Sequence, residues 1–210
     1  MRMRFFLGIT GASGAIYGAR ALRALSGAGC DVGVCASDAA LQVAGHELFG
    51  LGPRPAVSDE QITARLLDRF ATGPGTVEMI DPRDLTSRYA SGSSKLDGML
   101  IAPCSMSTLA VIANGTGQNL IHRAADVALK ERRRLVLMAR ETPLSAVHLE
   151  NMLTVTRAGA VVLPAMPGFY HLPQSMDDLV DFVVGRALDQ LGVEHDLTRR
   201  WGERPAEAGT

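Results

Sequence analysis

The chain has 210 residues, of which 47% are hydrophobic and 20% are charged, and its formal net charge is −1. This composition is typical of a single globular domain, which we expect to span residues 1–210, and it excludes a disordered chain. The near-zero charge gives no basic footprint for nucleic acid. No uncharged apolar run approaches the roughly 20 residues of a membrane-spanning helix. The apolar run near the N-terminus leads straight into a glycine-rich turn, so we expect the first core strand of a cytoplasmic protein rather than a signal peptide.

Apolar runs of strand length alternate with amphipathic segments in the first half of the chain. In order, the pattern predicts a strand over Arg4–Thr10, a helix over Tyr17–Leu25, a strand over Val32–Ala36, a helix from Leu41 through Ala44 and a strand over Val77–Ile80. Ser37 is the expected N-cap of the second helix. Residues 50–75 carry glycines and prolines around a short polar helical stretch, which we interpret as an excursion from the domain.

The second half continues the same alternation. It predicts strands over Gly98–Ala102, Leu135–Ala139 and Ala160–Leu163, and helices over Thr108–Ala113, Ala124–Lys130, Leu144–Val155 and Met176–Leu191. A polar tail, residues 198–210, follows. Near-continuous apolar strands between helices predict a three-layer α/β, Rossmann-like fold with a mostly parallel sheet. Ligands of such sheets bind beyond the carboxyl ends of the strands, where this chain places its Gly, Ser and Pro clusters.

The first of these clusters, Thr10 to Gly14, follows a strand and opens a helix. Its small residues let the backbone approach a ligand, and the N–H groups of the helix N-terminus favour a phosphate. A tight turn without a ligand is the alternative. The loop also resembles the start of NAD(P)-binding dehydrogenases, but those enzymes need a Tyr and a Lys four residues apart, and no tyrosine here has that lysine.

Three later segments carry polar groups with two interpretations each. Cys104 to Thr108 offers hydroxyls for a phosphate or an isoalloxazine edge, or simply an N-cap at Ser105. Arg123 and Lys130 stand seven residues apart on one helix face, which suits a phosphate or a solvated surface. Arg140 to Pro143 follows a strand and fits an anion clamp with an acid–base group, or a surface ion pair.

Two further patterns argue against metals and disulfides. The three cysteines form no framework and no metal-ligand spacing, so we expect buried thiols. Asp177 to Asp181 matches the D-D-x-x-D metal motif of isoprenyl diphosphate synthases. Those enzymes are all-helical and carry two such motifs, whereas this α/β chain has one, at a helix start where carboxylates favour the dipole. We therefore expect no metal.

Taken together, the motifs resemble the UbiX-type flavin prenyltransferases, in register from about Arg4 to Glu203. The segments that carry the resemblance are Gly8–Ala15, Ser91–Ser93, Pro103–Ser105, Arg123–Val127, Leu129–Arg133, Arg140–Pro143, Gly168–His171 and Pro173–Ser175. The resemblance implies a flavoprotein fold and transfer of a dimethylallyl group from dimethylallyl monophosphate, or sometimes the diphosphate, to N5 and C6 of reduced FMN, without a metal. The product, prenylated FMN, is the cofactor of a separate UbiD-type decarboxylase. Family members are homo-oligomers, and a dodecamer is expected.

The same resemblance implies roles for individual residues. The FMN-binding set is Gly11, Ala12, Ser13, Ser37, Ser105, Met106, Ser107, Thr108 and Arg140. The dimethylallyl phosphate set is Tyr170 and Arg186, with Lys130 and Arg123 beside them. The catalytic set is Glu141 as the acid–base residue, Lys130, Ser13 and Glu47 as a supporting carboxylate. Trp201 is expected to fold over a site as a lid, and Leu85 replaces a tryptophan found in some members.

Two alternatives remain open. An FMN-dependent cysteine decarboxylase of the related fold carries a catalytic His in an early helix and an Asn in a later loop, but here Pro167 follows Pro164-Ala165-Met166. A non-catalytic flavin-binding subunit of a decarboxylase is the other. The charged and aromatic residues of the donor site, together with Glu141, argue against an inert binder.

Overall fold

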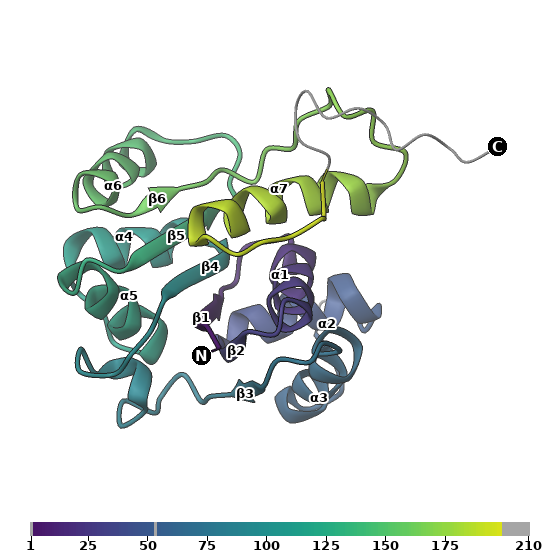
Figure 1. Cartoon of the computed structure of the whole chain (residues 1–210), viewed down its shortest axis with the longest axis horizontal. Coiled ribbons are helices and arrows are strands. Elements are labelled where there is room, and N and C mark those ends of the chain that lie inside the picture. The colour runs from purple at the N-terminus through teal and green to yellow at the C-terminus, as the bar shows by residue number, and fades with distance from the viewer. Residues whose placement is uncertain (1, 53, 199–210) are drawn as a thin grey trace.

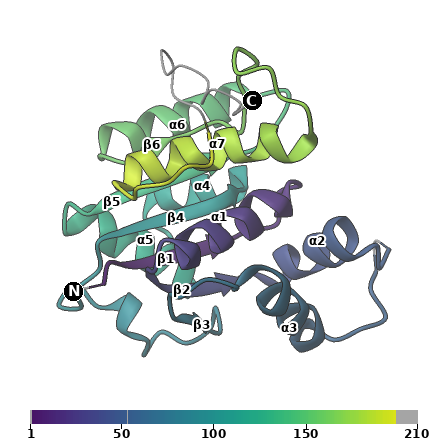
Figure 2. The same cartoon turned by 45° about the vertical axis from the view of Figure 1, so that its right-hand side comes forward.

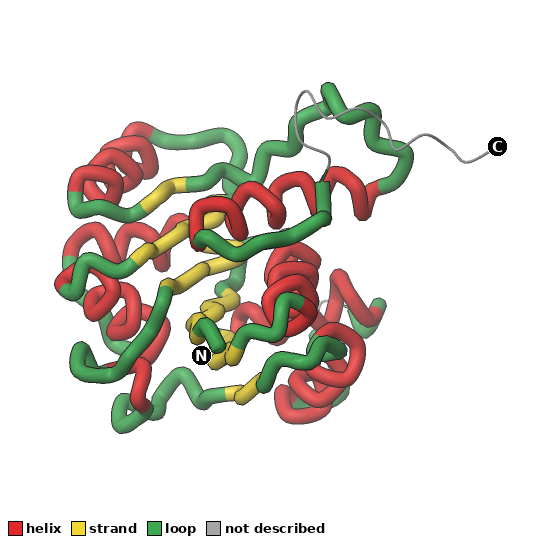
Figure 3. The backbone as a smooth tube through the Cα atoms, viewed as in Figure 1, coloured by secondary structure: helices red, strands yellow, loops and turns green. Residues whose placement is uncertain are grey.

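The strands pair in parallel in the order β3-β2-β1-β4-β5-β6 (Figures 1 and 3). They are β1 (Arg4–Ile9), β2 (Asp31–Ala36), β3 (Val77–Met79), β4 (Gly98–Cys104), β5 (Arg134–Ala139) and β6 (Val161–Val162). The computed structural model describes residues 2–52 and 54–198. The expected lid at Trp201 lies outside these residues, as does the rest of the tail beyond residue 198.

Helices cover both faces of the sheet. One face carries α1 (Ala15–Gly27), α2 (Asp38–Phe49), α3 (Asp59–Phe70) and α7 (Met176–Leu191). The other carries the 3-10 helix η1 (Arg88–Ala90), α4 (Met106–Asn114), α5 (Leu120–Lys130) and α6 (Ala146–Arg157). Figure 2 shows α1 and α7 side by side, and they are in contact. Within the described part of the chain, no helix is long and apolar enough to cross a membrane.

The two faces have separate cores, and β1 contributes to both. Phe5, Leu7 and Ile9 point into the core beneath α1 and α7, whereas Phe6 points into the core beneath α4 and α5. Successive strand residues alternate between faces, so a strand buried on both sides must be apolar throughout. This is why the strands read as unbroken apolar runs, and the predicted three-layer α/β fold with a parallel sheet is confirmed.

Three helix starts were predicted too late. The first helix begins at Ala15 rather than Tyr17, the fourth at Met106 rather than Thr108 and the fifth at Leu120 rather than Ala124. The apolar stripe fixes only where the buried face begins, while the first turn of a helix is set by its cap. Ser37 is the N-cap of α2, as predicted, and its side chain accepts from the N–H of Ala40.

The segment over residues 50–75 contributes to the hydrophobic core, although it was interpreted from the sequence as a polar excursion from the domain. It contains α3, whose N-cap Ser58 forms a capping box with Gln61. Ile62, Leu66 and Phe70 stand four residues apart on one face and are buried in the core beneath α1. The helix therefore packs onto the main domain through a narrow apolar stripe.

The three cysteines are buried and free. Burial raises the pKa of Cys35 and of Cys104 to about 12, and it raises that of Cys30 as well. A raised pKa lowers the thiolate fraction at neutral pH, so these groups are poor nucleophiles and act as packing residues.

We expect Gly18→Ala to destabilise the protein by about 1–3 kcal/mol, because the new methyl group would overpack the interface of α1 with the sheet. A Cβ atom at Gly18 would lie 2.4 Å from the carbonyl oxygen of Ala102. The matched control is Gly27→Ala in the same helix, where a Cβ atom meets nothing within 4 Å. Urea unfolding should show unchanged or increased stability for the control, and equal loss in both variants would contradict the packing argument.

Candidate active site

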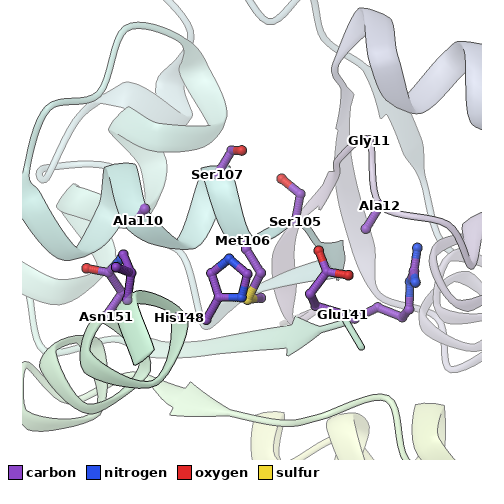
Figure 4. Close-up of a pocket in the computed structure, with 11 residues that line it drawn as sticks. Gly11, Ala12, Ser105, Met106, Ser107, Ala110, Glu141, His148 and Asn151 are labelled. Atoms are coloured by element: carbon purple, nitrogen blue, oxygen red, sulfur yellow. The ribbon is translucent and has the colours of Figure 1, made fainter. Parts of the chain in front are cut away.

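A cavity of about 370 Å³ opens at the carboxyl edge of the sheet (Figure 4). The loops after β1, β4 and β5 line it together with the first turns of α4 and α6. Its lining residues are Gly11, Ala12, Ser105, Met106, Ser107, Ala110, Arg140, Glu141, Val147, His148 and Asn151. Of the residues predicted to bind FMN, this pocket unites Gly11, Ala12, Ser105, Met106, Ser107 and Arg140, and it adds Glu141.

The loop after β1 packs closely against α2. A Cβ atom at Gly11 would lie 2.6 Å from the Cβ of Ala39, so only glycine lets the loop take this position. The N–H groups of Gly14 and Ala15 each donate to Oε2 of Glu47 at 2.8 Å. The sequence led us to expect a phosphate on this helix N-terminus. In the structure a carboxylate already binds there, because a negative group stabilises the same N–H groups and the same dipole.

The start of α4 is held by hydroxyl groups. Ser105 is its N-cap, and its Oγ accepts from the N–H of Thr108 at 3.2 Å. The N–H of Ser105 donates to Oγ1 of Thr10 at 2.8 Å, and that hydroxyl in turn donates to the carbonyl of Pro103. Thr108 is buried. The capping interpretation of this segment is therefore correct, and Ser107 stands at the pocket wall.

Arg140 and Glu141 follow β5. Nε of Arg140 donates to the carbonyl oxygen of Ser13 at 2.9 Å, so the guanidinium reaches across from β5 to the loop after β1. Glu141 is exposed, and its Oε1 accepts from the N–H of Thr142 at 3.0 Å. A cation and a carboxylate thus stand at one pocket, which is the combination expected of an anion clamp with an acid–base group.

The wall contributed by α6 was missed by the sequence analysis, which named no residue of this helix as part of the site. Val147, His148 and Asn151 line the pocket from this helix. A usable signal was present, because His148 and Asn151 stand three residues apart and so share one helix face. The helix also begins at Ala146, with Ser145 as its N-cap, soon after the loop that carries Arg140.

Several predicted site residues lie outside this pocket. The side chain of Ser37 is engaged in capping α2. Tyr170 is 52% exposed, and its ring meets the ring of Phe182 edge-on at 5.6 Å. Arg186 pairs with Asp189 at 2.9 Å and lines a second groove together with Phe182. Phe182 therefore contacts Tyr170 and shares a groove with Arg186, the two residues predicted to bind the allyl phosphate.

Lys130 and Arg123 are placed elsewhere, on α5. Lys130 pairs with Glu131 beside the loop at Gly92, and Arg123 pairs with Asp126 at 2.6 Å. Lys130 lies before the start of β5, whereas the pocket lies beyond its carboxyl end. The six residues of β5 span about 17 Å, so Lys130 is at the opposite edge of the sheet. Arg123 and Leu85 line a separate cavity of about 300 Å³. A single chain does not bring these two cations to the other predicted residues.

The D-D-x-x-D segment has a structural role in α7. Arg20 of α1 donates to the carboxylates of Asp177 and Asp181, and both Arg20 and Asp181 are largely buried. The backbone N–H of Gln174 and the capping serine before the helix hold the pKa of Asp178 below its usual range. Over residues 2–52 and 54–198, no group of three or more His, Cys, Asp or Glu side chains could hold a metal ion.

Known proteins are similar to this chain in both sequence and fold. The model of the flavoprotein family matches residues 2–188. A flavin prenyltransferase UbiX of Halalkalibacterium halodurans is 51% identical over 200 residues, covering 95% of this chain and 93% of that protein. The UbiX of Pseudomonas aeruginosa is 48% identical and covers 96% of this chain and 95% of its own length.

Solved structures agree with these relatives. AnUbiX (PadA1), crystallised with FMN and dimethylallyl pyrophosphate, superimposes with a TM-score of 0.84 at 40% identity, covering 97% of this chain and all of that one. A dodecameric FMN-dependent UbiX-like decarboxylase of Escherichia coli O157:H7 gives 0.81 at 40% identity, covering 96% and 100%. The cysteine decarboxylase TvaF gives 0.60 at 16% identity, a likeness of fold alone.

The parallel sheet, the helices on both faces and the pocket at the carboxyl edge define an α/β flavoprotein. Within that class, the chain belongs to the UbiX family of flavin prenyltransferases, as its identity to curated members over nearly its whole length requires. The family assignment made from the sequence motifs is confirmed.

The capping role of Glu47 predicts a graded response to substitution. Glu47→Gln keeps a carbonyl oxygen that accepts from Gly14 and Ala15, so its unfolding free energy should change little. Glu47→Ala removes the acceptor, and we expect a loss of about 1 kcal/mol, the usual cost of a lost N-cap. Urea unfolding of the flavin-free protein measures both. Equal stability of Glu47→Ala and the parent protein would show that the carboxylate does not hold the loop.

Proposed function

We propose that this protein transfers a dimethylallyl group from dimethylallyl monophosphate to N5 and C6 of reduced FMN. The observation that carries the proposal is that Gly11, Ser105, Arg140 and Glu141, from three loops far apart in the sequence, line one pocket. The relatives from Halalkalibacterium halodurans and Pseudomonas aeruginosa are flavin prenyltransferases, and AnUbiX (PadA1) was crystallised with both FMN and dimethylallyl pyrophosphate.

The lining of the pocket fits FMN. Arg140 supplies a cation, and the small residues Gly11 and Ala12 expose the backbone, which together suit a phosphate and a ribityl chain. Met106, Ala110 and Val147 provide an apolar wall that suits a flat ring. The side chain of Ser13 is not part of the pocket lining, but its backbone carbonyl oxygen accepts from Arg140 and so orients the guanidinium. When bound, reduced FMN supplies the nucleophilic nitrogen and carbon.

The chain's own residues have the chemistry to handle the allyl donor. The carbon–oxygen bond of the donor breaks with both electrons going to the phosphate, so cations must bind the leaving group. Arg186 and Lys130 are suited to this, while the ring face of Tyr170 shelters the allyl cation from water. Glu141, with one oxygen engaged by Thr142, has a second oxygen available to accept a proton at the flavin.

We further propose that two copies of the chain complete the donor site. Lys130 and Arg123 lie on α5, away from Tyr170 and Arg186, so an arrangement in which all four act on one phosphate requires a second copy. Exposed apolar side chains are available for such contacts. Val147, Leu149 and Leu153 of α6 are 62%, 53% and 49% exposed, and Phe169, Leu172 and Met176 around the Tyr170 loop are more exposed still. The dodecameric relative supports assembly as a dodecamer.

The product and its recipient follow from the reaction. We propose that prenylated FMN passes to a UbiD-type decarboxylase and that the protein works in the cytoplasm, where its three free thiols are stable. The cysteine decarboxylase alternative rests on fold likeness alone, and no residue of the pocket favours it. The inert-subunit alternative does not explain why a cation, Arg140, and a carboxylate, Glu141, line the same pocket.

The reaction can be tested directly. Protein incubated without oxygen with FMN, a reductant and dimethylallyl monophosphate should yield a flavin heavier by one dimethylallyl group, measured by mass spectrometry of the extracted flavin. Glu141→Gln should keep FMN binding and slow product formation strongly, because the proton acceptor is lost. Unchanged FMN with both the monophosphate and the diphosphate would reject the proposed function.

The shared donor site can be tested by mixing inactive subunits. Lys130→Ala and Arg186→Ala should each bind FMN but prenylate it slowly. Co-expressed with different tags and purified as mixed oligomers, the two variants should regain about a quarter of the parent activity, because that share of sites receives both native residues. No recovery in the mixture would mean that both residues serve the site of their own chain.

A further inference from the structure

His148 is fixed in one orientation by the cap of α6. The side chain of Ser145 accepts from the backbone N–H of His148 at 3.3 Å, and Nδ1 of His148 accepts from the backbone N–H of Ser145 at 3.3 Å. This is a reciprocal capping box, in which a histidine takes the place usually held by Glu or Gln. The ring is thereby held against the first turn of the helix rather than free to rotate.

The cap also selects the tautomer. A backbone N–H can only donate, so Nδ1 must present its lone pair, and the neutral imidazole then carries its hydrogen on Nε2. Among the described residues, Nε2 has no hydrogen-bond partner, and His148 lines the pocket. In the view of Figure 4 its ring lies between Asn151 on one side and Glu141 on the other. The cap therefore presents one oriented N–H donor to the pocket.

The surroundings of this donor indicate what it binds. Near it in Figure 4 lie Met106, Ala110 and the amide of Asn151, and the apolar side chain of Val147 also lines the pocket. The cation of the pocket, Arg140, is tied to the loop after β1 on the other side. A phosphate requires the cation, so it suits the Arg140 side. The His148 side suits a flat uncharged ring whose edge carries both acceptors and a donor.

We propose that Nε2–H of His148 donates to a carbonyl oxygen on the pyrimidine edge of the isoalloxazine ring, with the Asn151 amide beside it. This inference rests on the proposed function only in that FMN occupies the pocket. The pyrimidine edge alternates carbonyl acceptors with one N–H, which an imidazole donor and a carboxamide can match. His148 is then a flavin-binding residue that sets the rotation of the ring in its plane, and Ser145 positions it through Nδ1.

Substitutions at His148 can separate the donor from the cap. His148→Gln keeps an acceptor for the N–H of Ser145 and keeps an N–H donor. His148→Glu keeps the cap acceptor but has no donor, and His148→Leu has neither and carries no charge. Fluorescence titration gives the dissociation constants for FMN and for riboflavin, which lacks the phosphate. Urea unfolding of the flavin-free proteins reports on the cap.

We expect His148→Gln to bind both flavins within about threefold of the parent protein, and His148→Glu and His148→Leu to bind both about tenfold more weakly, the loss expected for one hydrogen bond. His148→Glu should unfold at the parent urea concentration, and the absorbance band of bound FMN should shift in the donor-free variants. Parent-like flavin affinity in both donor-free variants would overturn the proposal. So would a loss confined to FMN, which would place the contact at the phosphate. Failure of the parent protein to bind either flavin would instead reject the FMN site itself, and with it the proposed function.

Discussion

The hydrogen bonds that tie one strand-end loop to the next determine the shape of the pocket. Thr10, directly after β1, bonds to Pro103 near the end of β4 and to Ser105 after it, and Arg140 after β5 bonds back to Ser13. A parallel sheet delivers its loops to one edge but leaves their relative heights free. These bonds fix the heights, so that backbone, hydroxyl and guanidinium groups from three loops meet at one cavity.

Much of the fold was accessible from the sequence, because the central strands are buried on both faces and are therefore apolar along most of their length. The family and several pocket residues were accessible as well, since short motifs such as Arg140 and Glu141 occupy strand ends whose position the sheet dictates. The starts of α1, α4 and α5 were not, because the first turn depends on a cap rather than on apolar spacing. Glu47 illustrates a deeper limit. Its bond to Gly14 joins residues 33 apart, and no local pattern announces it.

His148 and Lys130 illustrate two different limits of the sequence analysis. No local pattern singles out His148, because its orientation depends on the cap of α6, which only the three-dimensional structure reveals. The lysine and Arg123 were grouped with Tyr170 and Arg186 through family motifs, which report what acts together in a working assembly. One chain places them on different surfaces, which is the basis of the proposal that two copies complete the donor site, and the periodicity of one chain gives no signal for such an arrangement.

The ion pair of Arg20 with Asp181 of α7 is much less exposed than the pairs that Arg186 and Lys130 form. Only 16% of the Arg20 side chain and 13% of that of Asp181 is exposed, against 53% for Arg186 and 47% for Lys130 in their own pairs. Dissolved salt screens exposed pairs far more than buried ones. Rising ionic strength therefore releases the surface guanidinium and ammonium groups from their carboxylates first, while α1 and α7 keep their spacing, so the scaffold and the charges that it displays respond to the solvent independently.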